Sequence, residues 1–172
     1  MRKFTTIAVL GAAAALLTAG PASASTHAAP KATGNIVQVA SGAPQFSTLV
    51  SLIKKAGLVK TLSGKGPFTV MAPTNAAFAK VPKATLDAIA ADKATLTKVL
   101  TYHVIAGKVP AAKVVTLNGK TATTVEGSTI AISVKGGKVY LNGSTQVTKT
   151  DIPASNGVIH QINGVLLPPD LD

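Results

Sequence analysis

The sequence predicts an α+β domain whose first half is mainly helical and whose second half is mainly stranded. In the first half, apolar residues recur at the spacing that places them on one face of a helix; they are Phe46, Leu49, Val50 and Ile53. In the second half, apolar and polar residues alternate from Thr129 to Lys135, the period of a half-buried strand. Asn-Gly pairs begin at positions 118, 142, 156 and 163, and all four lie in this half, where they predict turns between strands.

Residues 1–24 are predicted to be a signal peptide. Arg2 and Lys3 precede an apolar, Ala-rich run, and residues 22–24 (Ala-Ser-Ala) supply the small side chains that signal peptidase requires. The apolar run from Phe4 to Leu17 is shorter than the roughly 20 residues of a membrane-spanning helix. We therefore expect cleavage after Ala24 and a secreted, extracellular product with no membrane span after cleavage.

The remaining chain is expected to contain one domain. Residues 25–34 are small, polar and Pro-containing, which is typical of a flexible segment. The folded domain is predicted to span residues 35–168, followed by a short tail, residues 169–172. The sequence contains no cysteine, which excludes both disulfides and a lipid-modified cysteine, so packing alone must stabilise a product that we expect to be a monomer.

The charge of the chain is strongly positive. After removal of the signal peptide, 15 lysines, no arginine and 6 acidic residues remain, a net charge of +9. Lysine lacks the planar fork with which arginine contacts phosphates and guanine, and the chain after residue 24 has only five aromatic residues and no tryptophan for base stacking. The composition therefore favours solubility or loose attraction to an acidic cell-surface polymer, and argues against a nucleic-acid partner.

Individual elements follow from local signals. Asn35 is a good N-cap for a first helix, Gly57 is a plausible end of the second, and Asp92 is a good N-cap for a later one. In the second half, strands are expected at Val114-Val115, Thr129–Val134 and Lys138–Leu141. Gly136-Gly137 lies between the last two of these strands and predicts a two-residue hairpin turn.

The sequence offers little material for catalysis. It contains neither a Gly-x-Ser-x-Gly nucleophile elbow nor a phosphate-binding loop, and its acidic residues are few. His103 and His160 could meet in the core, where a histidine pair could bind a metal or haem iron. The simpler interpretation is that each is a partly buried histidine bound to the backbone. We therefore predict no enzyme activity, no metal and no cofactor.

Three blocks of the sequence, in order, resemble the fasciclin-type (FAS1) domain family. Residues 68–78 (FTVMAPTNAAF) resemble its first box, and residues 100–104 (LTYHV) resemble its central Tyr-His segment. Residues 150–152 (TDI) together with residues 156–168 (NGVIHQINGVLLP) resemble its second box. Among family members, the chain is most similar to small, single-domain secreted bacterial proteins.

The resemblance implies a wedge-shaped fold with a seven-stranded, two-sheet β core and several helices packed along one side. It also implies adhesion or binding at the cell surface or matrix, without catalysis. In animal members, a Tyr-His segment and an Asp-Ile pair take part in integrin binding, and the matching residues here are Tyr102, His103, Asp151 and Ile152. The chain departs from the family at Asn163, where aspartate is common, which weakens any inference of a charge-dependent partner.

Physical reasoning gives several of these motif residues a role in keeping the fold. Thr74 and Asn75 follow a proline and could cap the next helix, and Asn156-Gly157 precedes the strand that contains His160. Tyr102 and His103 adjoin apolar runs, which favours the core for both residues. Asp151 is followed by Pro-Ala-Ser after one residue, which predicts an exposed loop where its carboxylate could meet a partner.

Two functions remain open from the sequence. The first is a secreted, non-catalytic module that mediates adhesion, or binds an extracellular protein or polysaccharide, at the cell surface or in the extracellular matrix. The second is an extracellular carrier that holds a small apolar or pigment ligand in a cleft between the helices and the sheet.

Overall fold

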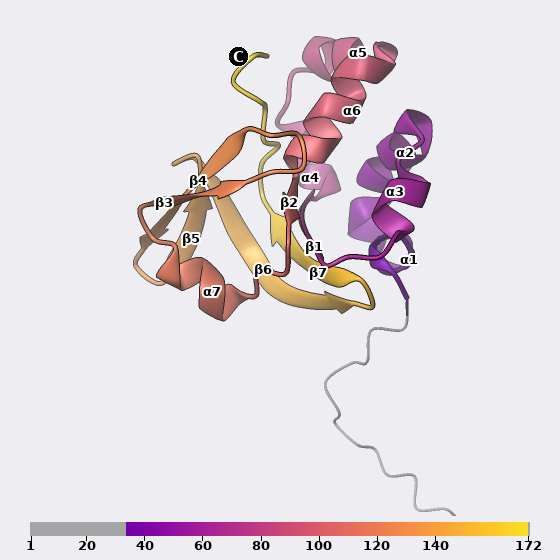
Figure 1. The fold of residues 1–172 in the computed structure, drawn as a ribbon. Coiled ribbons are helices and arrows are strands. Elements are labelled where there is room, and N and C mark those ends of the chain that lie inside the picture. The colour runs from indigo at the N-terminus through magenta and orange to yellow at the C-terminus, as the bar shows by residue number, and fades with distance from the viewer. Residues whose placement is uncertain (1–33, 172) are drawn as a thin grey trace, which may run out of the picture.

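The computed structural model describes residues 34–171, in which most of the helices pack along one side of a seven-stranded sheet (Figure 1). The predicted α+β fold class is confirmed. The predicted signal peptide and nearly all of the predicted N-terminal segment lie outside the described residues. The described helices are α1 (Ile36–Ser41), η1 (Pro44–Phe46), α2 (Ser47–Ala56), α3 (Val59–Ser63), α4 (Asn75–Ala79), α5 (Lys83–Ala91), α6 (Lys93–Tyr102) and α7 (Ala111–Thr116).

The helix ends show the local signals that the sequence predicted. Asn35 and Gln38 form a capping box at the start of α1. Asp92 starts α6 by accepting hydrogen bonds from two backbone N–H groups of the first turn. Gly57 ends α2 in the left-handed conformation, with φ of 77°, which costs a glycine little.

The seven strands are joined in the order β2-β1-β7-β6-β5-β4-β3. Only β1 and β7 run parallel, and the other neighbours are antiparallel. Gly136-Gly137 connects β4 to β5, as the sequence predicted, with positive φ at both glycines. The strands are β1 (Phe68–Pro73), β2 (Val104–Ala106), β3 (Lys120–Thr123), β4 (Thr129–Lys135), β5 (Lys138–Leu141), β6 (Thr145–Ala154) and β7 (Gly157–Ile162).

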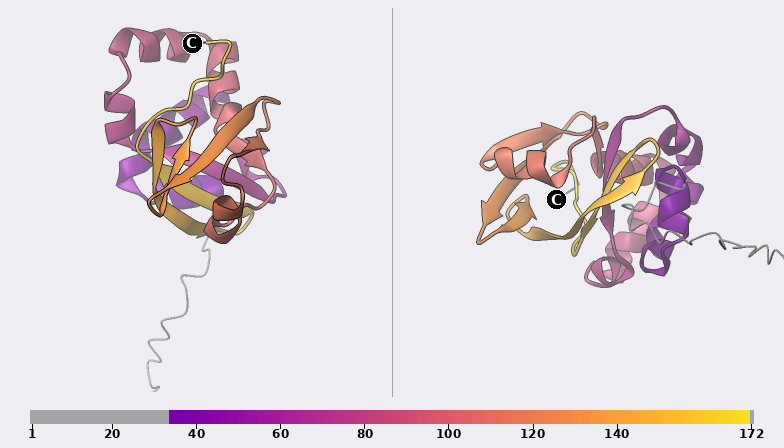
Figure 2. Two further views of the ribbon diagram at one scale, coloured as in Figure 1. Left: turned by 90° about the vertical axis from the view of Figure 1, so that its left-hand side faces the viewer. Right: turned by 90° about the horizontal axis from the view of Figure 1, so that it is seen from below.

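Strand β6 divides the sheet into two parts. Thr145 and Gln146 pair with β5, whereas residues from Val147 onward pair with β7, and the register of β6 shifts twice along this second part. The two outer strands also approach each other, because Ile105 of β2 bridges to Thr124, just after β3. Strands β3–β5 therefore curl away from the helices, as the view from below shows (Figure 2).

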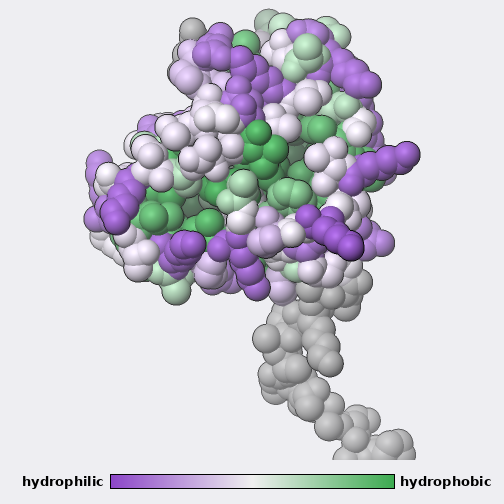
Figure 3. Space-filling model, in the orientation of Figure 1, coloured by the Kyte–Doolittle hydropathy of each residue, from purple (hydrophilic) through white to green (hydrophobic). Residues whose placement is uncertain are grey.

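Two hydrophobic cores result from this arrangement. The first lies between the helices and strands β1 and β7, and the second lies among the curled strands, beneath α7. Figure 3 shows one face of the molecule, where hydrophilic side chains surround a central hydrophobic area between the helical and stranded parts. The second core includes Met71, Tyr102, Val114, Ile130, Ile132, Leu141 and Ile162.

The predicted strand at Val114-Val115 is wrong, because both residues lie in α7. Pro110 precedes the helix, where its missing N–H costs nothing. Val114 is 2% exposed and packs into the second core, whereas Val115 is 48% exposed. Two adjacent valines favour a strand, but in α7 Val114 lies on the buried face and Val115 on the exposed face. The burial of Val114 therefore outweighs the strand preference of the pair.

Candidate functional site

Tyr102 lies at the end of α6 and is only 2% exposed. Its hydroxyl donates a hydrogen bond to the carbonyl of Thr129 at 3.1 Å and accepts one from the amide of Asn142 at 3.0 Å. Both partners belong to the stranded half of the chain. Tyr102 therefore fastens α6 to the curled strands and offers almost no side-chain surface to a partner.

His103 follows Tyr102 and is equally buried. Its Nδ1–H donates to the carbonyl of Val99 at 2.7 Å, and its Nε2 accepts from the N–H of Leu166 at 2.9 Å. Burial lowers the pKa of His103 to about 4, although the hydrogen bond to Val99 acts in the opposite direction. The ring is therefore neutral at pH 7, with both nitrogens bound to backbone groups.

Asp151 lies within β6, so the expectation that it occupies a loop is wrong. It sits where the register of β6 shifts, and its φ of 55° is unusual for a residue with a side chain. Its carboxylate is exposed and accepts a hydrogen bond at 2.9 Å from the N–H of Ala111, the first residue of α7. Ile152 is partly buried and packs against the first core.

His160 in β7 connects Asp151 to the segment before α7. Its Nδ1 accepts from the N–H of Asp151 at 3.3 Å, and its Nε2–H donates to the carbonyl of Val109 at 2.7 Å. Burial lowers the pKa of His160, opposed by the hydrogen bond to Val109 and by the negative charge of Asp151. Like His103, this ring has both nitrogens engaged by backbone groups, an arrangement that suits a structural histidine better than a metal ligand.

The Tyr-His and Asp-Ile pairs are connected through the sheet. The N–H of Met71 in β1 donates to the carbonyl of His103, and Met71 pairs in register with His160, which contacts Asp151. Tyr102 and His103 are buried, so Asp151 is the member of the two pairs whose side chain is most available to a partner.

Asn156 and Gly157 form a compact junction at the β6–β7 turn. The side-chain oxygen of Asn156 accepts from the N–H of Ile36 at 2.9 Å, and its amide donates to the carbonyls of Leu62 and Gly64. A Cβ atom on Gly157 would lie 1.9 Å from the carbonyl oxygen of Phe68. Only glycine fits this crossing without moving the backbone.

Thr74 and Asn75 act on different helices. Thr74 caps α4 by accepting from the N–H of Ala77. Asn75 does not cap α4; its oxygen accepts from the N–H of Thr48, and its amide donates to Pro44 and Ser47. It thereby joins α4 to the start of α2, because the fold brings these segments together, which the local sequence could not reveal.

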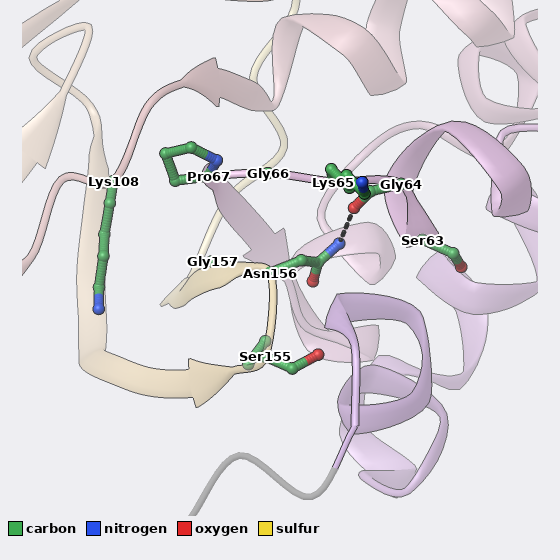
Figure 4. A pocket seen from close by; sticks show the side chains of 10 residues that line it. Ser63, Gly64, Lys65, Gly66, Pro67, Lys108, Ser155, Asn156 and Gly157 are labelled. Carbon is green, nitrogen blue, oxygen red and sulfur yellow. Dashed lines mark hydrogen bonds between the residues drawn. The ribbon is translucent and has the colours of Figure 1, made fainter.

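The structure also shows a basic cleft that sequence reasoning missed. It has a volume of about 530 Å³, and Figure 4 shows Lys65 and Lys108 on either side of Pro67 and Gly157. The cleft could not be predicted from the sequence, because the residues that line it come from three segments that are far apart along the chain. We call it the Lys65–Lys108 cleft; it is lined by Ser63, Gly64, Lys65, Gly66, Pro67, Lys108, Ala154, Ser155, Asn156 and Gly157.

An apolar gap lies between α2, α4, α5 and α6, where a carrier would hold its ligand. Its lining includes Leu49, Phe78 and Leu96, but its volume is only about 10 Å³. That is close to the minimum that holds a single water molecule. This gap between the described helices is therefore too small to hold a small apolar ligand.

Comparisons with known proteins identify the family of this chain. The fasciclin domain model matches residues 44–168. Protein sll1483 of Synechocystis sp. is 47% identical over 146 residues, which cover 84% of this chain and 79% of that protein. Transforming growth factor-beta-induced protein ig-h3 of Sus scrofa is 35% identical over 136 residues, which cover 79% of this chain but 20% of that protein.

A solved structure shares the fold. It is a FAS1 domain pair from the insect cell adhesion molecule fasciclin I, with a TM-score of 0.66 and 18% sequence identity. The match covers 81% of this chain and 52% of the insect chain, so this chain spans about half the length of its structural neighbour. Taken with the match to the domain model, these relatives show that the chain belongs to the fasciclin (FAS1) domain family.

Proposed function

We propose that this protein is a secreted, non-catalytic module that mediates adhesion or binds a protein or polysaccharide at the cell surface or in the extracellular matrix. The observation that carries the proposal is the family: the fasciclin model spans most of the chain, and the fold is shared with a cell adhesion molecule. The partner is an extracellular protein or an acidic cell-surface polymer.

The polar side chains support a binding role rather than catalysis. Catalysis needs titratable groups that converge on a substrate. Here both described histidines are buried and bound to backbone groups. Among residues 34–171, four of the five acidic side chains also have partners: backbone N–H groups donate to Asp92, Glu126 and Asp151, and Lys98 pairs with Asp170.

Secretion rests on the predicted signal peptide. Between residues 34 and 171, no helix combines the length and apolar character needed to cross a membrane. Protein from culture supernatant should begin at Ser25 when its N-terminus is sequenced. A start at Met1, or recovery in the membrane fraction, would contradict export with cleavage after Ala24.

The adhesion role can be tested with labelled protein on intact cells. Residues 25–172 should bind cells of the producing organism saturably, and unlabelled protein should compete. A lysine-rich protein of similar size and net charge is the control, because diffuse attraction would let it compete equally well. Binding that does not saturate, or that the control displaces completely, would contradict a specific adhesion module.

A further inference from the structure

We propose that the Lys65–Lys108 cleft binds a segment of acidic polysaccharide through carboxylate or sulfate groups. This inference rests on the proposed function and assigns its partner class and its site. Three features support it. Two lysines at the cleft have no ion-pair partner among the described residues, hydrogen bonds fix the backbone beside each lysine, and the lining contains small and polar residues but no aromatic ring.

The two ammonium groups are available to a ligand. Lys65 and Lys108 are exposed, and the cleft lining contains no acidic residue. Within residues 34–171, the ion pairs all involve Lys98, on another part of the molecule. A bound anion therefore meets two positive charges without having to displace an internal carboxylate.

The backbone beside Lys65 is fixed by Asn156. The amide of Asn156 donates to the carbonyl of Gly64 at 2.9 Å (Figure 4), and the carbonyl of Asn156 accepts from the N–H of Phe68 at 3.0 Å. A Cβ atom on Gly66 would lie 1.9 Å from the carbonyl oxygen of Asn156. The segment that contains Lys65 is therefore packed tightly against the β6–β7 turn.

The backbone beside Lys108 is fixed by Thr69. This threonine is fully buried; its hydroxyl donates to the carbonyl of Gly107 at 2.7 Å and accepts from the N–H of Val109 at 2.8 Å. The N–H of Gly107 also donates to the carbonyl of Pro67, another residue that lines the cleft. The residues on both sides of Lys108 are thus held in place, which lowers the entropy lost when a ligand binds.

The lining favours a polysaccharide over other polyanions. Ser63 and Ser155 provide hydroxyl groups, and small residues leave room for a chain of sugars. No aromatic residue lines the cleft, so nucleic-acid bases have no stacking surface. Large apolar side chains that could enter a lipid surface are also absent from this lining.

A second cleft with two lysines is a weaker candidate. It is lined by Lys80 and Lys83, but its walls include Phe78 and Leu86. Lys80 already donates to the carbonyl of Asn163 at 3.0 Å. One of its two cations is therefore committed to the fold.

The test compares two double variants, each of which loses two positive charges and therefore has the same net charge as the other. Lys65→Gln/Lys108→Gln changes the cleft, and Lys135→Gln/Lys138→Gln changes exposed lysines at the β4–β5 hairpin. The probes are a sulfated heparin oligosaccharide and an oligogalacturonate, which carries carboxylates. Comparison ligands are single-stranded DNA and vesicles that contain phosphatidylglycerol. Binding is measured by calorimetry at physiological salt, and thermal melts check that both variants fold like the wild type.

We expect the cleft variant to lose at least about tenfold in affinity for one or both oligosaccharides, because two charge-assisted contacts are removed. The hairpin variant should stay within about threefold of the wild type, as exposed charges contribute little. Equal losses in both variants, no loss in either, or no oligosaccharide binding at all would overturn the proposal. The proposal would also be overturned if binding to DNA or to vesicles depended on the cleft lysines as strongly as binding to the oligosaccharides does.

The cell-binding assay separates this inference from the proposed function. If the wild-type protein binds cells saturably but neither oligosaccharide, the cleft assignment fails and the adhesion role stands. If saturable cell binding is absent, the adhesion role fails whatever the cleft binds in isolation.

Discussion

The side-chain amide of Asn156 donates a hydrogen bond at 2.7 Å to the carbonyl of Leu62, which lies 94 residues earlier in the chain. The same side chain accepts a hydrogen bond from the N–H of Ile36 at the start of α1. Helix ends have backbone groups that the helix itself cannot satisfy. One residue of the β6–β7 turn therefore supplies partners for two helices of the opposite half.

Replacement of Asn156 by alanine should destabilise the protein by about 2–4 kcal/mol, because three partly buried backbone groups would lose their partner. The free energy of unfolding can be measured by denaturant titration with circular dichroism. Asn118→Ala is the matched control: Asn118 also accepts from a backbone N–H, that of Val134, but at an exposed site. Its expected cost is about 1 kcal/mol. Equal costs for the two variants would contradict a special role for Asn156.

Gly157→Ala should be more damaging than an ordinary overpacked variant. The new Cβ would lie 1.9 Å from a carbonyl oxygen of β1, so the β1–β7 pairing must shift. We expect a loss above about 3 kcal/mol, beyond the usual cost of overpacking. Gly42 has φ of −76°, and a Cβ atom added there would have no neighbour closer than 3.6 Å. Gly42→Ala should therefore be neutral or stabilise by about 0.4–1 kcal/mol; similar melts for both variants would refute the steric argument.

The sequence predicted elements whose signals are local. The caps at Asn35 and Asp92, the end of α2 at Gly57 and the hairpin at Gly136-Gly137 each depend on residues within one turn of one another. These short-range preferences are strong enough to survive in the folded chain.

Features that depend on tertiary contacts could not be predicted in this way. Val114 is helical because one face of α7 covers the second core. Asn75 bonds to Thr48, 27 residues away, instead of capping its own helix. The Lys65–Lys108 cleft exists because three distant segments meet, so its cations cannot be distinguished from other lysines in the sequence alone.

Stability should fall as the pH drops from about 6.5 to 4, in part because of His103. Burial holds the pKa of its folded form at about 4, below the usual 6.5. In this window the unfolded chain binds a proton that the folded chain excludes, so stability is present above pH 6.5 and is lost as the pH falls. The full shift corresponds to a contribution on the order of 3 kcal/mol.

Nuclear magnetic resonance titration of the imidazole signals tests this directly. The ring of His103 should stay neutral until the pH approaches 4 or the protein unfolds. In a His103→Gln variant, the loss of stability between pH 6.5 and 4 should be shallower than in the wild type. Titration of the His103 ring near its ordinary value in folded protein would show that the ring is not held neutral by burial.

Asp151 allows a structural role to be separated from a role in binding. Its carboxylate accepts from the N–H of Ala111, and its φ of 55° favours Gly, Asn or Asp. Asp151→Asn keeps an acceptor oxygen and tolerates this backbone, so its melting temperature should match the wild type. Asp151→Gly keeps the backbone conformation but loses the acceptor, at about 1 kcal/mol, and Asp151→Ala adds roughly 1 kcal/mol of backbone strain.

The same variants then test the partner role of the exposed carboxylate. Because Asp151→Asn removes the charge but preserves the hydrogen bond, weaker cell binding by this variant would reflect contact with a partner. We expect this result, since Asp151 is the most exposed member of the two pairs that the sequence resemblance predicts to take part in recognition. If Asp151→Asn instead lowers stability by more than about 1 kcal/mol, the charge itself supports the start of α7. Its effect on cell binding would then reflect altered folding, and Asp151 should be removed from the candidate partner surface.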